Sequence, residues 1–203
     1  MTTWNERFAA GEYPRDPEPS PVLEGHVAAR EPGRALDLAT GTGRNALFLA
    51  DVGWQVDALD QSRVGLELAR ETARERGVDD RIDWVQADAT SYAFPAGTYD
   101  LVAVSFYRAV DRFADLKEAL APDGLLYVQH HLRTTDDVDV GPGTDRYRFA
   151  ANELCNACLD LTILYFDQKI ETRADGATSA TTEIVARNSH GTRQSYPEVA
   201  QRE

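Results

Sequence analysis

The sequence predicts a single α/β domain with a Rossmann-like, doubly wound sheet of seven strands, mostly parallel with a C-terminal antiparallel hairpin. Two observations predict this fold. Up to residue 129, apolar runs of strand character alternate with segments of helical periodicity, which implies βαβ crossovers and a parallel sheet. After residue 158, two further apolar runs flank a turn at residues 174–177, and this arrangement is typical of a β-hairpin.

The chain before the first strand contains four prolines between residues 14 and 21. Because proline lacks a backbone donor and disfavours regular structure in the residue before it, we expect residues 11–21 to form an ordered or lid-like loop. A short helix follows at residues 23–29. Apolar runs then predict parallel strands at residues 35–38, 55–60, 82–87, 99–105 and 125–129.

Capping and turn residues set the ends of the predicted helices. A helix at residues 44–52 is stopped by Gly53, and Ser62 caps a longer helix that ends at Gly77. Another helix covers about residues 112–120, and residues 122–124 make the turn into the fifth strand. After a helix near residues 151–158, the hairpin is built from residues 159–170 and 179–187.

Length and composition fit one domain. A chain of 203 residues, 42% of them hydrophobic, can bury a sizeable core. We assign residues 1–203 to one domain, with residues 1–30 as an N-terminal lid or helical segment and residues 188–203 as a polar tail. No apolar run approaches the ~20 residues that a membrane span needs. Residues 1–6 lack a basic, apolar leader, so we expect a cytoplasmic location.

The net charge of −13 is spread along the whole chain. Two explanations stay open. In a salt-adapted, halophilic cytosol, screening makes the self-repulsion of an acidic protein tolerable; otherwise the acidic surface serves the function. Both explanations disfavour direct binding to nucleic-acid phosphates, because such binding needs a basic surface.

The two cysteines form a Cys-x-x-Cys pair, Cys155 and Cys158. Two thiolates do not complete a tetrahedral zinc site, and the sequence has no second pair. We therefore expect small residues packed on a helix face, with a redox or metal role as the alternative.

Residues 35–45 join an apolar run, an acid and two glycines, directly before a helical segment. Gly41 and Gly43 let the backbone approach a ligand, and the helix start offers free N–H groups, which together indicate a nucleotide-cofactor site. Ala46 stands where a dinucleotide fingerprint needs its third glycine, and no Gly-Lys-Ser/Thr follows, so a P-loop is excluded. A dinucleotide-binding domain would usually also lack the terminal hairpin.

Three acids fall at the ends of successive parallel strands, where open sheets bind ligands. Asp60 is placed to accept from both hydroxyls of a ribose, Asp88 from an adenine amine, and Asp37 lies near a cationic amino group. A cofactor with an ammonium, a sulfonium and no phosphate suits this set, so S-adenosylmethionine fits and NAD does not. Each acid also has a structural alternative: Asp60 as a helix cap with Ser62, Asp88 as a surface turn residue, and Asp37 as an acceptor for loop N–H groups.

These features resemble the class I S-adenosylmethionine-dependent methyltransferases, and more narrowly their small tellurite-resistance and thiopurine-type branch. The resemblance covers about residues 4–187 and rests on residues 4–8, 11–13, 37–46, 60–62, 65–66, 87–88, 99–102 and 120–124. The Gly-Arg-Asn-Ala run at residues 43–46 and the aromatic N-terminal segment are the more branch-specific parts. The remaining motifs are shared by the superfamily.

The resemblance implies a set of cofactor-binding residues. The methionine portion would lie among Asp37, Ala39, Gly41 and Gly43, the ribose on Asp60 and Gln61, and the adenine on Asp88 and Ala89, with Ser105 lining the pocket. Ala39 departs from the glycine that many members have. Trp4 and Tyr13, with Phe8, are expected either to fold over the cofactor as a lid or to form an aromatic staple on the surface.

Methyl transfer is an in-line displacement whose thioether leaving group needs no acid, so positioning and exclusion of water can supply much of the rate. We therefore expect no catalytic triad, and the sequence indicates no metal site. Side chains beyond strands four and five are the catalytic candidates: Phe106, Tyr107, Arg108, His130 and His131. Alternatively, one histidine packs into the sheet while the other faces solvent, and Arg108 pairs with Asp111 instead of attracting an anionic acceptor.

The branch resemblance implies a small, soft acceptor such as a thiol or a chalcogen oxyanion. Residues 134–147 look like a flexible acidic loop that could gate the pocket, and their acidity argues weakly against a strongly anionic acceptor. We expect a small-molecule substrate, no nucleic-acid or membrane partner, and a monomer or homodimer. The competing functions are a non-catalytic S-adenosylmethionine-binding protein, an NAD(P)-dependent oxidoreductase, and a methyltransferase of a larger substrate.

Overall fold

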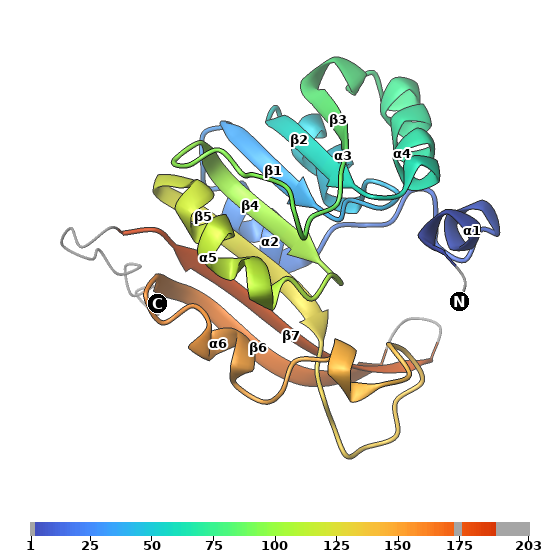
Figure 1. The fold of residues 1–203 in the computed structure, drawn as a ribbon, viewed down its shortest axis with the longest axis vertical. Helices are drawn as coiled ribbons and strands as arrows, with labels where there is room; N and C mark the ends of the chain where they lie inside the picture. The colour runs from blue at the N-terminus through green and yellow to red at the C-terminus, as the bar shows by residue number, and fades with distance from the viewer. Residues whose placement is uncertain (1–2, 173–175, 190–203) are drawn as a thin grey trace, which may run out of the picture.

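The computed structural model describes residues 3–172 and 176–189, which form a seven-stranded sheet in the order β3-β2-β1-β4-β5-β7-β6 (Figure 1). The strands are β1 (Arg34–Leu38), β2 (Gln55–Asp60), β3 (Ile82–Gln86), β4 (Tyr99–Ser105), β5 (Leu120–His131), β6 (Thr162–Thr172) and β7 (Thr178–Arg187). β1 to β5 are parallel, and β7 runs antiparallel to both β5 and β6. The predicted fold class is confirmed, although residues 174 and 175 of the predicted hairpin turn lie outside the described residues.

Helices cover both faces of the sheet, as expected for a doubly wound domain (Figure 1). They are α1 (Trp4–Ala9), α2 (Pro21–Val27), α3 (Arg44–Asp51), α4 (Arg63–Arg76), α5 (Phe113–Ala119) and α6 (Glu153–Asn156). Leu23 of α2 and Leu47 of α3 pack on one face with Val56 and Tyr127. α5 and the segment around α6 pack on the opposite face, and the two resulting cores hold the sheet between them.

Local signals explain most helix ends. The Ser62 hydroxyl accepts from Gly65 N, and α4 ends at Gly77 in the left-handed region (φ 74°), both as predicted. α2 starts two residues earlier than expected, because Ser20 caps it and Pro21 occupies the first turn, where a missing N–H has no cost. The helix predicted near residues 151–158 shrinks to the single turn α6.

The predicted turn at residues 122–124 is wrong, because this segment is part of β5. β5 already pairs with β4 at Leu120, and an irregularity in the pairing between Tyr99 and Leu101 accommodates Asp123 at φ 63°. Asn188 stabilises the irregular segment by donating through its side chain to the carbonyls of Leu120 and Ala121. The predicted polar tail therefore starts with a buried residue, and residues 190–203 lie outside the described residues.

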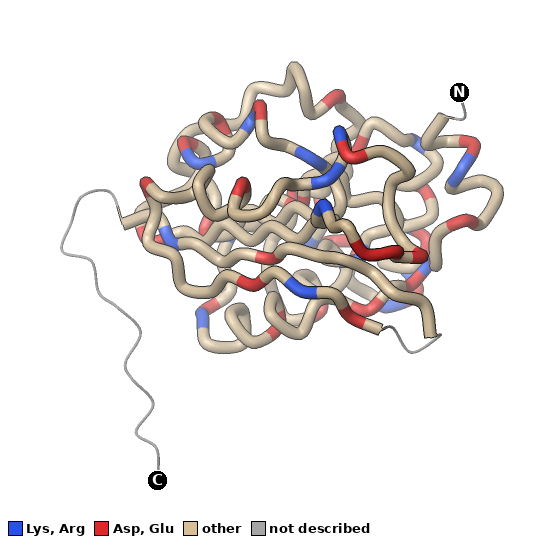
Figure 2. Tube along the Cα trace, turned by 90° about the horizontal axis from the view of Figure 1, so that it is seen from below, with Lys and Arg blue, Asp and Glu red and all other residues tan. Residues whose placement is uncertain are grey.

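Acidic and basic residues are scattered along the chain trace, over most elements (Figure 2). Several of them form exposed ion pairs, such as Arg63 with Glu67 on α4. Exposed ion pairs of this kind contribute little to the free energy of unfolding. The fold is therefore stabilised mainly by the two hydrophobic cores, and the charged residues mainly determine the character of the surface. Within the described residues, every helix is too short or too polar to cross a bilayer.

Candidate cofactor and acceptor site

Asp37 is the second-last residue of β1, and its carboxylate is buried next to the glycine loop, with only 1% of the residue exposed. One carboxylate oxygen accepts from Thr40 Oγ1 at 2.5 Å and from Ala46 N at 3.1 Å, and the other accepts from Asn45 Nδ2 at 3.0 Å. Burial raises the pKa of Asp37 to about 6, and these hydrogen bonds limit the rise. Asp37 is thus an acceptor for the loop, the structural alternative that the sequence left open, and it stays at the base of the site.

The loop between β1 and α3 uses left-handed backbone at Ala39 (φ 58°), Gly41 (φ 57°) and Gly43 (φ 92°). Gly41 N donates to a carboxylate oxygen of Asp60 at 2.8 Å, so the loop joins the ends of β1 and β2. A Cβ on Gly43 would lie 3.0 Å from the side chain of Ala69. Both glycines are therefore required where the loop turns and where α3 approaches α4.

Ala39 is the strained residue of this loop, because an L side chain in the left-handed region costs about 1 kcal/mol. We expect Ala39→Gly to raise the free energy of unfolding by about 0.5 kcal/mol, since relief of strain exceeds the added chain entropy. Thermal or urea unfolding measures this change. The control is Ala28→Gly, at an exposed helix end with φ −59°, which should be neutral or destabilising. A loss of stability in Ala39→Gly equal to that of the control would contradict the strain.

Asp60 ends β2 and is also largely buried. Besides Gly41 N, its carboxylate accepts from Ser62 N at 2.7 Å, so it supports the start of α4 as well as the glycine loop. Burial raises its pKa, and these backbone donors oppose the rise. Gln61 follows as an exposed residue at the same edge. The structure therefore brings Asp37 and Asp60 together on two sides of one loop.

Asp88 differs from these two acids in being exposed. Its carboxylate accepts from both the backbone and the hydroxyl of Thr90 at 2.8 Å, and these bonds lower its pKa. This is the turn geometry of the structural alternative. Ala89 is buried, and its carbonyl accepts from Arg112, which also binds the carbonyl of Tyr92 at 2.7 Å. Sequence reasoning missed Arg112, because no motif marks an arginine that fastens a distant loop.

The N-terminal aromatic residues pack over the glycine loop. Phe8 is buried, and a Cβ on Gly41 would lie 3.3 Å from its ring. Trp4, which is 42% exposed, and Tyr13 contact the Phe8 ring, with centroids 6.0 Å and 5.2 Å away. Asn5, which the sequence analysis missed, accepts from the Ser62 hydroxyl and Val64 N at the start of α4. α1 therefore lies beside α4, on the side to which the strand ends point (Figure 1).

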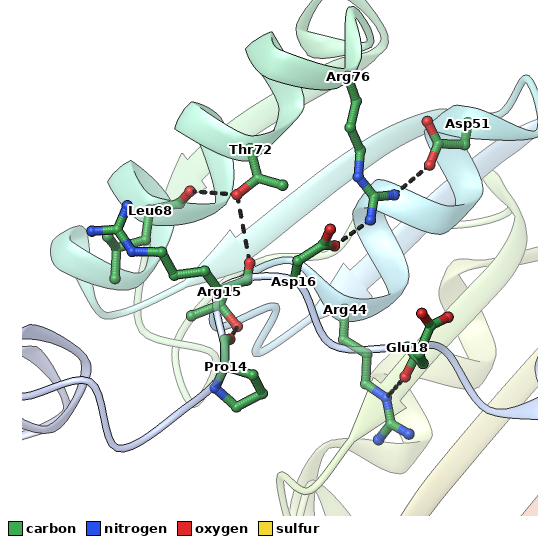
Figure 3. Close-up of polar contacts among 10 residues, drawn as sticks. Pro14, Arg15, Asp16, Glu18, Arg44, Asp51, Leu68, Thr72 and Arg76 are labelled. Carbon is green, nitrogen blue, oxygen red and sulfur yellow. Dashed lines mark hydrogen bonds and ion pairs between the residues drawn. The ribbon is translucent and has the colours of Figure 1, made fainter.

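Residues 14–20 form a strap that is bonded to the helices flanking the glycine loop (Figure 3). The bonds join Pro14 to Thr42, Arg15 to Thr72, Asp16 to Arg76, and Glu18 to Arg44. The strap ends at Ser20, whose hydroxyl donates to the buried Glu183 of β7 at 2.5 Å. The predicted loop at residues 11–21 is thus ordered, and its last residue belongs to α2.

The ends of β4 and β5 form a second wall of the site. Asn45 is 2% exposed, and its amide donates to Ser105 Oγ at 3.1 Å as well as to Asp37. Phe106 has a left-handed backbone (φ 57°) and is 41% exposed, with its ring 4.9 Å from that of His131. The Arg44 guanidinium lies 5.5 Å from the Phe106 ring. The sequence analysis named Arg44 and Asn45 only as parts of a motif. The structure shows that both contact this wall, Arg44 at Phe106 and Asn45 at Ser105.

The candidate catalytic residues have different surroundings in the structure. His130 is buried against Phe149, and burial lowers its pKa to about 4, so the imidazole is a neutral and weak base. His131 is half-buried and faces the Phe106 wall. Arg108 is bonded to Glu153, not to Asp111. The Arg108 guanidinium is therefore paired with a carboxylate of the protein, and this ion pair does not orient it toward a methyl acceptor.

Tyr107 lies on the side of the site that carries Asp88. It is half-buried, and desolvation raises its pKa above the ordinary value, so its hydroxyl is protonated at neutral pH. A hollow of about 280 Å³ is lined by Thr90, Tyr107, Arg108, Ala109, Asp111 and Arg112. A hollow of about 350 Å³ beside Lys117 and Leu161 lies away from the glycine loop and belongs to the outer surface of α5.

The acidic loop at residues 134–147 is bonded to the rest of the domain. Asp139 accepts from the backbone and hydroxyl of Thr178 at 2.8 Å. At the other end, the buried Arg148 donates to the carbonyls of Pro142 and Leu132. The middle of the loop is thus held at Asp139 and Pro142. It lies beside His131, because a Cβ on Gly141 would be 3.1 Å from the His131 ring.

The two cysteines fit the packing interpretation. Cys158 is buried, and burial raises the pKa of its thiol to about 12, while Cys155 is half-buried; neither forms a disulfide. No group of three or more potential metal ligands forms anywhere in residues 3–172 and 176–189. The cysteines therefore contribute to the core around α6.

The sheet order and the glycine loop define a doubly wound α/β domain with a ligand-binding edge at the carboxyl ends of its parallel strands. Residues 35–124 match the family model described as "Methyltransferase domain", which confirms the predicted domain type for this part of the chain. A demethylmenaquinone methyltransferase of Thermus thermophilus is 39% identical over 108 residues, covering 49% of this chain and 47% of that protein. A ubiquinone/menaquinone biosynthesis C-methyltransferase UbiE of Pseudomonas entomophila is 33% identical over 129 residues, or 60% and 50% of the two chains. This chain spans about half the length, or less, of the curated relatives it matches.

Solved structures share the fold over most of the chain. A SAM-dependent methyltransferase from Methanosarcina mazei has a TM-score of 0.68 with 18% identity, over 85% of this chain and 99% of that one. TehB from Haemophilus influenzae has a TM-score of 0.68 with 22% identity, over 82% and 61%. At these identities the comparison concerns the fold, and it confirms the seven-stranded sheet with antiparallel C-terminal strands.

Proposed function

We propose that the chain binds S-adenosylmethionine and transfers its methyl group to a small-molecule acceptor. The observation that carries this proposal is the pair Asp37 and Asp60 on either side of the Gly41 loop. The loop lies where the strand order reverses between β1 and β4, the position at which open α/β sheets bind ligands. The match of residues 35–124 to a methyltransferase domain supports the same conclusion.

The residues at this edge suit the chemistry of the cofactor. Two carboxylates offer hydrogen-bond acceptors and negative charge, which fit ribose hydroxyls and an ammonium. In our proposal Asp60 and Gln61 hold the ribose, Asp37 and the loop residues Ala39, Gly41 and Gly43 surround the methionine part, and Asp88 and Ala89 hold the adenine. Ser105 lines the pocket, and Trp4 and Tyr13 cover it together with Phe8.

Bound S-adenosylmethionine supplies an activated methyl group on a sulfonium. The protein's own contribution is to position the acceptor and to exclude water, because the thioether leaving group needs no acid. The aromatic residues of α1 and the strap would shield the cofactor side, and Phe106 and His131 would form the wall on the acceptor side. These residues would therefore act by positioning the reactants and excluding water.

The acceptor that we favour is a soft nucleophile, a thiol or a chalcogen oxyanion. A thiolate or an oxyanion can attack without a strong base, and buried His130 is a weak base. Arg44 donates to Gln129 Oε1 and to the carbonyl of Glu18, and it forms no ion pair within the described part of the chain. Its positive charge beside Phe106 is therefore available to an anionic acceptor. The structural likeness to TehB agrees with this branch.

A quinone ring carbon is the second candidate acceptor, because the relatives described above are quinone methyltransferases by name. The nucleophile would be a ring carbon of the reduced quinol, because an oxidised quinone is electron-poor. The ring carbon forms a bond to the methyl group as the methyl–sulfur bond breaks and then loses its proton, and half-buried His131 would be the base. The relatives match only about half of their length, so their substrate is a hypothesis for this chain.

An acceptor panel tests the proposal. S-adenosylhomocysteine formation is measured with small thiols, selenite, tellurite and a soluble demethylated quinone kept in its reduced quinol form by a chemical reductant, across a range of salt concentrations. We expect turnover with a thiol or an oxyanion, and we expect Arg44→Gln to lower kcat/KM for the oxyanion about tenfold, by loss of a charged hydrogen bond. Arg63→Gln, on the exposed face of α4, is the matched control and should change nothing. Turnover of the quinone alone would favour the second candidate, and cofactor binding without any turnover would favour a non-catalytic binding protein.

A further inference from the structure

We propose that two copies of the chain pair through the outer edge of β6, which joins their sheets into one. β6 forms the lower border of the sheet (Figure 1), with β7 hydrogen-bonded along one side. No strand of the described residues pairs with its other side. Such an edge presents a row of backbone N–H and C=O groups that can bind another strand.

The part of β6 that can pair is regular and centred on Gln168. An irregularity in the register falls between Ile163 and Tyr165, so the regular part runs from residue 165 to 172. A bulge of this kind ends pairing, which sets the length of strand that a partner could use. Gln168 lies near the middle of this stretch, and its side-chain Nε2 is shielded from solvent without a hydrogen-bond partner in the described structure.

The side chains of this stretch divide between the two faces of the sheet. Tyr165, Asp167, Lys169 and Glu171 alternate with Phe166, Gln168 and Ile170. On the first face Lys169 forms ion pairs with Asp167 and Glu171 of its own strand, at 3.9 and 3.2 Å. On the second face Ile170 is 47% exposed and could be covered by a partner strand.

A second copy of this chain fits the edge because the stretch is complementary to itself. When two β6 strands run antiparallel with Gln168 on the two-fold axis, Asp167 of each copy lies opposite Lys169 of the other. Phe166 of each copy then lies opposite Ile170 of the other, which covers the exposed aliphatic side chain.

Neighbouring registers are unfavourable, which makes this pairing specific. A two-fold axis at Lys169 would place Asp167 opposite Glu171 and Lys169 opposite itself. An axis at Asp167 would place that carboxylate opposite its own copy. Like charges directly opposite each other destabilise a strand pair, so these two axes are disfavoured. An axis at Ile170 would place Lys169 opposite Glu171 of the other copy, but it overlaps only residues 168–172 of the regular stretch, whereas the axis at Gln168 overlaps residues 165–171. The longer overlap favours the axis at Gln168. The competing explanation is that Lys169 protects the edge against pairing, as charged residues on edge strands do.

Charge exchange distinguishes the two explanations. Sedimentation velocity is measured for the wild type, Asp167→Lys, Lys169→Asp and the double exchange, at the lowest salt that keeps each folded by circular dichroism. We expect a wild-type dimer, twice the chain mass of 22.5 kDa, at about 100 µM, by mass action. Each single change should weaken the dimer about tenfold or more, and the double exchange should restore it. Glu67→Lys on α4 reverses a charge far from β6 and should leave the dimer intact.

A wild type that stays monomeric at every concentration would overturn the proposal, as would single variants that dimerise like the wild type. A covalent readout tests the register itself. Gln168→Cys, in a chain carrying Cys155→Ser and Cys158→Ser, should form a disulfide-linked dimer under mild oxidation, because this position meets its own copy on the axis. Glu67→Cys in the same background is the control and should remain monomeric, and equal cross-linking of both would contradict the register.

Discussion

Asp60→Ala is expected to weaken binding of S-adenosylhomocysteine by at least about 100-fold. A hydrogen bond to a charged group contributes roughly 1.5–3 kcal/mol, and in our proposal the carboxylate accepts two ribose hydroxyls. The same change removes the acceptor for Gly41 N and Ser62 N, so the loop would also lose its fixed shape. Isothermal calorimetry on the folded variant, well below its unfolding temperature, measures the effect.

Two further variants make this result interpretable. Asp60→Asn keeps the size of the side chain and should lose most of the affinity, because an amide nitrogen cannot accept from a hydroxyl or an N–H. Asp83→Ala removes an exposed aspartate from the neighbouring strand β3 and should bind like the wild type. Unchanged affinity in Asp60→Asn, with the fold intact, would show that the ribose does not bind Asp60.

Stability is expected to depend on pH through Asp37, and the Asp37→Asn variant isolates that dependence. The folded protein raises the pKa of Asp37 from 3.8 to about 6, because the carboxyl is buried. The protonated form is therefore favoured by folding, so its stabilisation is full below pH ~4 and is lost as pH rises through about 6. The shift corresponds to roughly 3 kcal/mol. Urea unfolding at several pH values should show wild-type stability falling by about this amount relative to Asp37→Asn.

The affinity for S-adenosylhomocysteine is expected to depend on pH through the same residue, but in the opposite direction to stability. An ammonium group near Asp37 would favour the carboxylate, so affinity for S-adenosylhomocysteine should increase as pH rises through about 6. This increase should vanish in Asp37→Asn and persist in Asp83→Asn. A pH profile that is the same in wild type and Asp37→Asn, for both stability and affinity, would contradict the role of Asp37.

The sequence was most informative where a local signal decides a local structure. Ser62 and Gly77 mark the ends of α4, and the alternation of apolar runs with helical periodicity correctly predicts that the first five strands are parallel. The prediction of a turn at residues 122–124 failed because Asn188, 68 residues after Leu120, donates to the carbonyls of Leu120 and Ala121 and so helps to hold this segment in β5. A tertiary contact of this kind leaves no local pattern.

In the candidate site, too, the sequence predicted what depends on local signals and missed what depends on tertiary contacts. Spacing after the strands placed Asp37, Asp60 and Asp88 at one edge, but it could not show that Asp37 is buried or that Asp88 binds its own turn. Those outcomes depend on which side chains cover each carboxylate after folding. Asn5 and Arg112 escaped the sequence analysis for the same reason, because each acts on a loop that is distant in the chain.

A crystal structure of the chain with S-adenosylhomocysteine would test the central claim most directly. Our account predicts that both ribose hydroxyls bind the Asp60 carboxylate, that the sulfur faces the Ser105 and Phe106 wall, and that Phe8 covers the ligand from the side of α1. A ligand bound away from Asp60, or a protein that takes up NAD into the Gly41 loop and leaves S-adenosylhomocysteine unbound, would contradict it.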